Sequence, residues 1–550
     1  MAGQRRMKRQ NFVTKNKLQM TALLILFISV LVKMVFLEKK APDRGMEIYL
    51  TTFTFIFMIA LILANTLREV VRKAIVYRNS RNQYKNAVKM MRTGAITGFV
   101  LGMIFWVLML VVSTKLTNAF FLLQAYGKFP MILAAAGIPF LLLAAALIGT
   151  FEGLGIDMSG GAAGMIFAIS DLLCSIAFIL LACRIGEKHS MLLHDSCVVD
   201  AFAAAGAAAG FAVACFLTAL WVMALSMAFG KKMKGKMNED NSRNQENFSE
   251  QLIGLLAAAG QPFIRYVALY GAVIINQVLR YLFYQAPVGE TGSPGFSLGA
   301  YACDYVLPFI WFILPFGMTL ILSSYVSEYL EKIMKKEDLY HCGMRMIAGI
   351  KQYLCMIFPM ICVLGVCLKG LNGAFFSSAV SVLPIIVVVA VTGYAILEAS
   401  MLTGMGKEWL AILCSLAALI VQSIAAVVIF SRNAVSVGNS ILYCNIIYAV
   451  VFAVGCGIFL ARLCVYKKHW LENLVLPFAA AFAAVITAVL CMFLQSVLGG
   501  VAAAILAIVL AAVVHMLVLI VTGCVRENEL SEFPQGNILA FLGHLLGIYS

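Results

Sequence analysis

PMILAAAGIPFLLLAAALIGTFEGLG, residues 130–155, contains about twenty apolar residues without a charge and ends in a Gly-x-Gly turn. An α-helix rises 1.5 Å per residue, so about 20 apolar residues cross the roughly 30 Å hydrocarbon core of a bilayer. The same pattern recurs along the chain, and predicts spans at 19–37, 47–66, 94–114, 130–149, 163–183, 203–229, 262–284, 304–325, 350–368, 377–402, 408–430, 440–461, 472–494 and 500–522. Helices satisfy every backbone polar group inside lipid. The predicted fold class is therefore an all-α polytopic membrane protein with fourteen transmembrane helices.

Composition agrees with this class. The chain is 62% hydrophobic and 12% charged, whereas soluble domains are about 25% charged. The longest polar loops are expected around 67–92 and 230–250, which leaves no room for a separate soluble domain. The first apolar stretch follows a basic tail and lacks a small-residue cleavage site, so it is expected to be a first span and not a signal peptide.

The net charge of +15 is concentrated in the tails and in alternate loops. Lys and Arg favour the cytoplasmic side of a membrane protein, so both termini are expected in the cytoplasm. The basic excess is then explained by topology and by contact with anionic membrane lipid, and not by binding to nucleic acid.

No chemical motif points to an enzyme. The fifteen Cys are scattered without a C-x-x-C pair, so neither a disulfide nor a metal site is predicted, and no cofactor is expected. GKKMKGKM, 230–237, approximates a phosphate-binding loop, but Met237 replaces the required Ser or Thr and no strand precedes it. No serine, cysteine or zinc constellation for hydrolysis is present.

A weak internal repeat divides the chain. Thr150–Gly155 and Met401–Lys407 each place a Gly-x-Gly turn after the fourth span of a set of six, and charged helical extensions begin near Arg68 and Glu328, after the second span of each set. Parallel repeats of this kind build a central cavity in several transporters. The predicted organisation is a basic tail (1–18), an N-lobe (19–229), a linker (230–250), a C-lobe (251–462), two further spans (463–524) and a tail with an interfacial helix (525–550).

Polar residues within spans mark candidate binding residues, because ionisable groups in lipid usually face a cavity or a partner. The seventh span carries Arg265, Asn276, Gln277 and Arg280, with Arg265, Asn276 and Arg280 on one helical face, and Lys33 lies in the first span. Arg suits bidentate contact with phosphate oxygens, so these residues are candidates for holding an anionic head group. Snorkelling of Lys33 and the two arginines to the interfaces is the alternative.

Two intramembrane carboxylates stand out. Asp171 in the fifth span and Glu398 in the tenth could each pair with one of these cations, or carry a coupling proton or sodium ion. Pro308 and Pro315 in the eighth span predict kinks.

Together these features resemble the multidrug/oligosaccharidyl-lipid/polysaccharide (MOP) exporter superfamily, and within it the branch of stage V sporulation protein B and the lipid II flippase MurJ. The resemblance rests on GMEIY at 45–49, the basic helix at 68–92, GTFEGLGIDM at 149–158, Pro315 with 324–332, and LTGMGK at 402–407. It implies two six-helix lobes around a central cavity plus two C-terminal helices, in a bacterial plasma membrane. It also implies alternating access that moves an undecaprenyl-diphosphate-linked saccharide to the outer leaflet, with Lys33, Arg265 and Arg280 holding the diphosphate. Ile148, Glu152 and Thr403 depart from the family pattern and place the cargo in doubt.

Three alternatives stay open. A cation-coupled multidrug exporter of the same superfamily would use carboxylates of the first lobe, of which Asp171 is the best candidate. A non-transporting scaffold that binds envelope-synthesis proteins would tolerate the missing family residues. A membrane-bound glycan polymerase or ligase would need a large charged outer loop, and the longest predicted outer loop, 285–299, has no Lys or Arg.

Overall fold

A computed structural model describes residues 12–41, 44–119, 127–156, 158–195, 197–236, 240, 245–283, 306–334, 339–371, 382–432, 437–463, 471–525, 530, 536–545 and 548. Within these residues, fourteen helices are long and apolar enough to cross a membrane. The predicted fold class is confirmed: the chain is a multi-pass, all-α membrane protein. Loop 285–299 and the predicted start of the eighth span lie outside the described residues.

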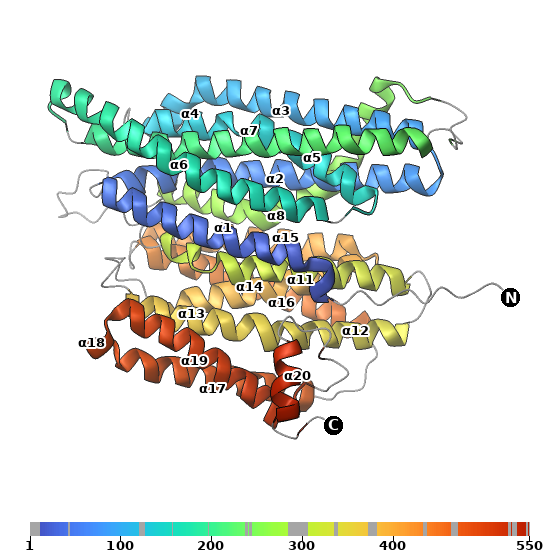
Figure 1. Ribbon diagram of the computed structural model, residues 1–550, viewed down its shortest axis with the longest axis vertical. Coiled ribbons are helices and arrows are strands. Elements are labelled where there is room, and N and C mark those ends of the chain that lie inside the picture. Colours follow the sequence, from blue (N-terminus) through green and yellow to red (C-terminus); the bar gives the residue numbers. More distant parts are fainter. Residues whose placement is uncertain are drawn as a thin grey trace.

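The helices run side by side in one elongated bundle (Figure 1). The first six spans are α1 (Phe12–Lys40), α2 (Gly45–Ser80), α3 (Tyr84–Ala119), α4 with α5 (Lys128–Ala136, Ile138–Gly153), α6 (Met158–Leu193) and α7 (Cys197–Lys236). The next six are α8 (Phe248–Phe283), α10 with α11 (Leu307–Ile310, Ile313–Met334), α12 with η4 and α13 (Leu339–Gln352, Tyr353–Ile357, Phe358–Leu371), α14 (Val382–Gly404), α15 (Glu408–Arg432) and α16 (Val437–Leu463). The remaining elements are η5 with α17 (Leu471–Val475, Leu476–Phe493), α18 (Gln495–Leu498), α19 (Gly500–Val521) and α20 (Gly536–Leu545).

The polar region at 67–92 is mostly helical, as the extension predicted to begin near Arg68 requires, and only its loop is shorter than expected. α2 continues to Ser80 and α3 begins at Tyr84, so only a tight turn separates them, with Asn82 at a φ of 56°. The charged residues extend both helices beyond the apolar segments, because ionised side chains at helix ends are solvated outside the hydrocarbon. The expected linker at 230–250 is likewise shortened, since α7 reaches Lys236 and α8 begins at Phe248.

Several spans of the described chain are interrupted. Gly137 separates α4 from α5, just before Pro139, and a turn at Trp311 and Phe312 separates α10 from α11, between Pro308 and Pro315. Proline lacks a backbone donor and breaks the helical ladder, which accounts for both sites. The kinked eighth span predicted from sequence is therefore present as a broken helix. In the ninth span, a π-helical turn (η4) joins α12 to α13 just before Pro359, whose missing backbone donor leaves the carbonyl of Cys355, inside the turn, without its helical partner.

Two Gly-x-Gly turns have the same backbone. Gly155 and Gly406 have φ values of +81° and +74°, a left-handed conformation that favours glycine. In each turn, the amide of the following residue donates to the carbonyl five positions earlier, at 2.8 Å and 2.9 Å. The first glycine of each pair, Gly153 or Gly404, lies against the backbone of α2 or α11, where a Cβ would clash. The turn and the helix beneath it are thus repeated in both halves.

Helix packing follows the same repeat. α1 packs on α6 and α2 on α5 in the first half, and α8 packs on α15 and α11 on α14 in the second. Across the halves, α1 packs on α11 and α2 on α8, which are equivalent contacts under the repeat. Each half has its own apolar core, one including Tyr49 and Leu142 and the other including Tyr353 and Leu397. We call the two halves the N-lobe (α1–α7) and the C-lobe (α8–α16).

Small residues allow close helix approach, which drives packing where lipid is as apolar as the protein. α6 and α7 form the tightest hairpin: Gly206 lies against the backbone of Phe178, and Gly210 against that of Ser175. The C-terminal helices α17 and α19 pack on α13 at the far edge of the C-lobe (Figure 1). α20 provides the tail helix expected from sequence and buries Leu539 in a small cluster with Leu519 of α19.

Candidate functional site

A buried ion pair lies in the N-lobe. Lys33 of α1 donates from Nζ to Asp171 Oδ2 of α6 at 2.6 Å, and both side chains are 3% exposed. Ser175, one turn further along α6, donates to the other carboxylate oxygen at 3.1 Å. Ser29, one turn before Lys33, donates to the carbonyl of Ala168 at 2.6 Å and fixes the register of α1 against α6. The ammonium group of Lys33 is therefore held inside the bundle and does not reach toward the interface.

Aromatic rings surround this pair. The Lys33 ammonium lies 5.5 Å from the centroid of the Tyr49 ring and 5.7 Å from that of Phe53. Tyr49, Phe53 and Phe57 stack along one face of α2 at centroid distances of 5.0 Å and 5.2 Å, and Phe211 of α7 meets Phe53 edge-on at 5.0 Å. Ring faces attract cations at such distances. The result is an apolar, aromatic environment with one neutral ion pair inside it.

Arg265 belongs to a second ionic network, between the lobes. Its guanidinium donates to Glu408 Oε1 of α15 at 2.8 Å and also pairs with Glu69 of α2. Tyr266 donates its hydroxyl to Glu69 at 3.0 Å. Lys73 lies 2.9 Å from Glu69 and 3.6 Å from Glu408. Arg265, which the sequence predicts to bind an anionic head group, is thus already paired with two carboxylates of the protein.

The other polar residues of the seventh span are separated from Arg265. Asn276 donates to Asn445 of α16 at 3.1 Å, and Gln422 of α15 donates to the same oxygen at 3.3 Å. All three side chains are buried, as is Gln277. Arg280 lies in α8, but its side chain is outside the described residues. The predicted polar stripe therefore contributes to two different clusters along α8.

Glu398 is a buried carboxylate of the C-lobe. It packs against Gly457 of α16 and makes no ion pair with any described residue. The two candidate carboxylates thus differ: Asp171 has a cationic partner, whereas Glu398 has none in the described part of the chain.

Several residues of these clusters are not predicted from the sequence, among them Glu408, Gln422 and Asn445. Gln422 and Asn445 are polar residues within spans, which is the signal that identifies Asn276. Glu69 and Lys73 belong to the charged helical extension that begins near Arg68. Glu152, a departure from the family pattern, is explained by its pairing with Arg68, whose Nε lies 3.0 Å from Glu152 Oε2.

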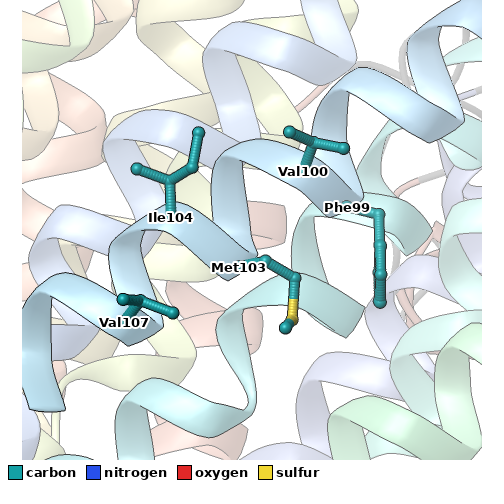
Figure 2. Close-up of a pocket in the computed structure, with 5 residues that line it drawn as sticks. All are labelled: Phe99, Val100, Met103, Ile104 and Val107. Atoms are coloured by element: carbon teal, nitrogen blue, oxygen red, sulfur yellow. The ribbon is translucent and has the colours of Figure 1, made fainter.

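A hollow on the surface of α3 is not a candidate site for polar chemistry. Figure 2 shows that Phe99, Val100, Met103, Ile104 and Val107 line it. All are apolar, and Val100, Ile104 and Val107 are each about half exposed. Such a face is expected to contact lipid.

No protein-family model matches this sequence, and no curated protein matches it by sequence. Solved structures do match. A MATE protein in complex with MaD3S is 14% identical and aligns with a TM-score of 0.54 over 83% of this chain and 97% of that one. A MOP superfamily transporter from Pyrococcus furiosus, whose reversed binding-pocket polarity suggests a different function, is 13% identical with a TM-score of 0.53 over 83% and 97%. An inward-facing MATE family multidrug resistance transporter is 14% identical with a TM-score of 0.52 over 81% and 95%.

At this identity the match establishes the fold. Over 81–83% of its length, the chain shares its fold with two MATE proteins and with a MOP superfamily transporter. The fold implied by the sequence resemblance is confirmed over the aligned part, and membership of the superfamily stays a prediction. The finer resemblance to the MurJ branch is not supported by these comparisons.

Proposed function

We propose that the protein is an ion-coupled exporter of amphipathic organic compounds, that it works by alternating access, and that Asp171 is its coupling carboxylate. The observation that carries this proposal is the buried Lys33–Asp171 pair among aromatic rings. The fold shared with MATE transporters supports it. The exporter of organic compounds, which is an alternative in the sequence analysis, thus becomes the main hypothesis.

Protonation of Asp171 changes the charge of the N-lobe interior. The ionised pair has no net charge, and a proton on Asp171 leaves Lys33 as an unpaired cation. An unpaired charge inside lipid is costly, by about 2.5–3.5 kcal/mol on insertion scales. Proton binding therefore favours a conformation in which Lys33 gains water or another partner, which is how a proton gradient drives rearrangement in this proposal.

The net charge of the Lys33–Asp171 site also determines which cargo the protein prefers. The site alternates between no net charge and a single positive charge, so neutral or anionic amphipathic compounds are favoured over cations. The partly exposed rings of Phe53 and Phe57, which stack on each other, provide flat apolar surfaces for such molecules.

Movement of an undecaprenyl-diphosphate-linked saccharide is the second candidate. The observation in its favour is that two cations, Arg265 and Lys73, both contact Glu408 between the lobes, where an anionic head group would pass. Against it, Lys33 and Arg265 already have carboxylate partners. For both candidates we place the protein in a bacterial plasma membrane with cytoplasmic termini, and its basic residues against anionic lipid.

Transport in proteoliposomes tests the proposal. We would impose a pH gradient and follow three fluorescent probes: a neutral amphipathic compound, a cationic one and an undecaprenyl-diphosphate saccharide. Wild type should move the neutral probe faster than the cationic one, and Asp171→Asn should lose gradient-driven movement by at least about tenfold. Glu328→Gln, at an exposed ion pair, is the matched control and should transport normally.

Two results would overturn the proposal. Movement of the lipid-linked saccharide alone would establish the second candidate. Movement of none of the probes by folded wild type would favour the scaffold function.

A further inference from the structure

The helix α8 is divided between the two lobes. Leu255 lies in the N-lobe core and Ala259 packs against it, whereas Ala272 lies in the C-lobe core together with neighbouring residues of the same helix. Pro262 lies between these two parts. Because proline removes a backbone hydrogen bond and clashes with the preceding turn, it is a natural point of bending.

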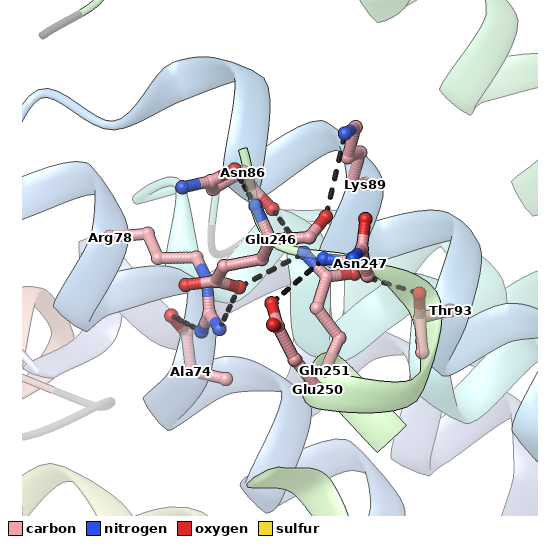
Figure 3. A network of polar contacts seen from close by, with 9 residues as sticks. All are labelled: Ala74, Arg78, Asn86, Lys89, Thr93, Glu246, Asn247, Glu250 and Gln251. Carbon is pink, nitrogen blue, oxygen red and sulfur yellow. Dashed lines mark hydrogen bonds and ion pairs between the residues drawn. The ribbon is translucent and has the colours of Figure 1, made fainter. Parts of the chain in front are cut away.

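The beginning of α8 is fastened to the N-lobe. Figure 3 shows Glu246 and Gln251 between the end of α2 and the beginning of α3. Arg78 of α2 donates to Glu246 Oε2 at 3.1 Å, and Gln251 donates to the same oxygen at 3.1 Å. Thr93 of α3 donates to Gln251 Oε1 at 2.8 Å. The part of α8 before Pro262 is thus tied to α2 and α3.

The ionic network with Arg265 lies just beyond Pro262. It contains two carboxylates, Glu69 of the N-lobe and Glu408 of the C-lobe, and two cations, Lys73 and Arg265. It is therefore neutral as a whole. Three of its four side chains are largely shielded, with 21% exposure at Arg265, 10% at Glu69 and 14% at Glu408, whereas Lys73 is 49% exposed.

This network can separate into two parts, one on each lobe, without leaving any charged side chain unpaired. Lys73 and Glu69 are on the same helix at i,i+4 spacing and remain paired at 2.9 Å. Arg265 and Glu408 both belong to the C-lobe side and remain paired at 2.8 Å. Only the links of Arg265 and Tyr266 to Glu69, and the longer one of Lys73 to Glu408, have to break. Breaking a shielded network is costly mainly when a charge loses every partner, and here none does.

We infer that Arg265, Glu69, Lys73 and Glu408 form a latch between the lobes, which opens by separating into two neutral pairs as α8 bends at Pro262. The inference rests on the alternating access of the proposed function. Glu69 holds the closed state, because it is the N-lobe partner of Arg265. Glu408 holds the open state, because it is the carboxylate that Arg265 retains after separation.

Two isosteric substitutions therefore have opposite effects. Glu69→Gln removes the links of Arg265 and Tyr266 across the lobes and leaves only the 3.6 Å contact of Lys73 with Glu408. Arg265 keeps Glu408 in both states, and Lys73, which is 49% exposed, is solvated by water when it loses Glu408, so this substitution favours opening. Glu408→Gln leaves Arg265 with a partner only in the closed state, so it favours closure. Glu152→Gln is the matched control, since Glu152 pairs with Arg68 inside the N-lobe.

Hydrogen–deuterium exchange of the purified full-length protein in nanodiscs measures these effects without any cargo. In peptides covering 66–78, 258–270 and 404–412, Glu69→Gln should raise the exchange rate about tenfold, which corresponds to about 1.4 kcal/mol. Glu408→Gln should leave it unchanged or lower, and Glu152→Gln should match wild type. Unaltered exchange in the α6–α7 hairpin verifies that each variant is folded.

Equal increases in Glu69→Gln and Glu408→Gln would show a merely structural cluster and overturn the latch, and so would the absence of any change in Glu69→Gln. Hydrogen–deuterium exchange does not depend on transport. A negative result for the latch can therefore be distinguished from a negative result for the proposed function.

Discussion

Removing one partner of the Lys33–Asp171 pair should destabilise the protein strongly, whereas removing both should not. Each side chain is 3% exposed, and the two meet at 2.6 Å. A buried charge that loses its partner costs about 3–5 kcal/mol, while replacement of both partners by apolar residues is often close to neutral. We therefore expect Lys33→Met and Asp171→Leu each to cost about 3–5 kcal/mol.

The double variant Lys33→Met/Asp171→Leu supplies the decisive comparison. It should be more stable than either single variant by about 3 kcal/mol, whereas two independent sites would make it less stable than either, since their costs add to within roughly 0.5 kcal/mol. The free energy of unfolding would be measured by reversible SDS titration in mixed micelles, followed by circular dichroism. As a control, Glu328→Gln breaks an exposed i,i+4 pair and should cost only about 0.3–0.5 kcal/mol.

Single variants that each cost less than about 1 kcal/mol would refute the reasoning, because the pair would then be solvated in solution. A double variant that shows the summed cost of the two single variants would also refute it, since the charges would not depend on each other.

Two further predictions concern backbone and packing. Gly406→Ala should lower the free energy of unfolding by about 1–2 kcal/mol, because the φ of +74° is unfavourable for a residue with a side chain. The control Gly254→Ala lies in a helix with open space around it, and should be neutral or stabilising by up to about 1 kcal/mol. Both variants would be measured by the same SDS titration. Asn445→Leu should cost about 1–3 kcal/mol, because Asn276 and Gln422 both donate to the lost oxygen; a thermal unfolding temperature equal to that of wild type would contradict this.

The sequence alone was sufficient for the class of protein and for the repeat. The length and apolarity of each span are local properties, and lipid leaves a helix as the only structure that satisfies the backbone. The two Gly-x-Gly turns could also be predicted from the sequence, because a glycine just past the end of an apolar helix is a local stop signal. Loop lengths were predicted less accurately. The charged residues that follow the apolar segment of the second span continue α2 as a helix to Ser80, so the loop after it is short.

The partners of the buried charges were decided only by the tertiary structure. Lys33 and Asp171 are far apart in the chain, as are Arg265, Glu69 and Glu408, and no local pattern states which carboxylate meets which cation. That choice changes the proposed chemistry, because a paired arginine is a link between lobes and an unpaired one is a site for an anion. The sequence by itself determined which residues enter the membrane, through hydrophobicity and helix length. The packing of six-helix lobes determined which of their charges neutralise each other, because Coulomb attraction in a medium of low polarity depends on distances that only the folded chain sets.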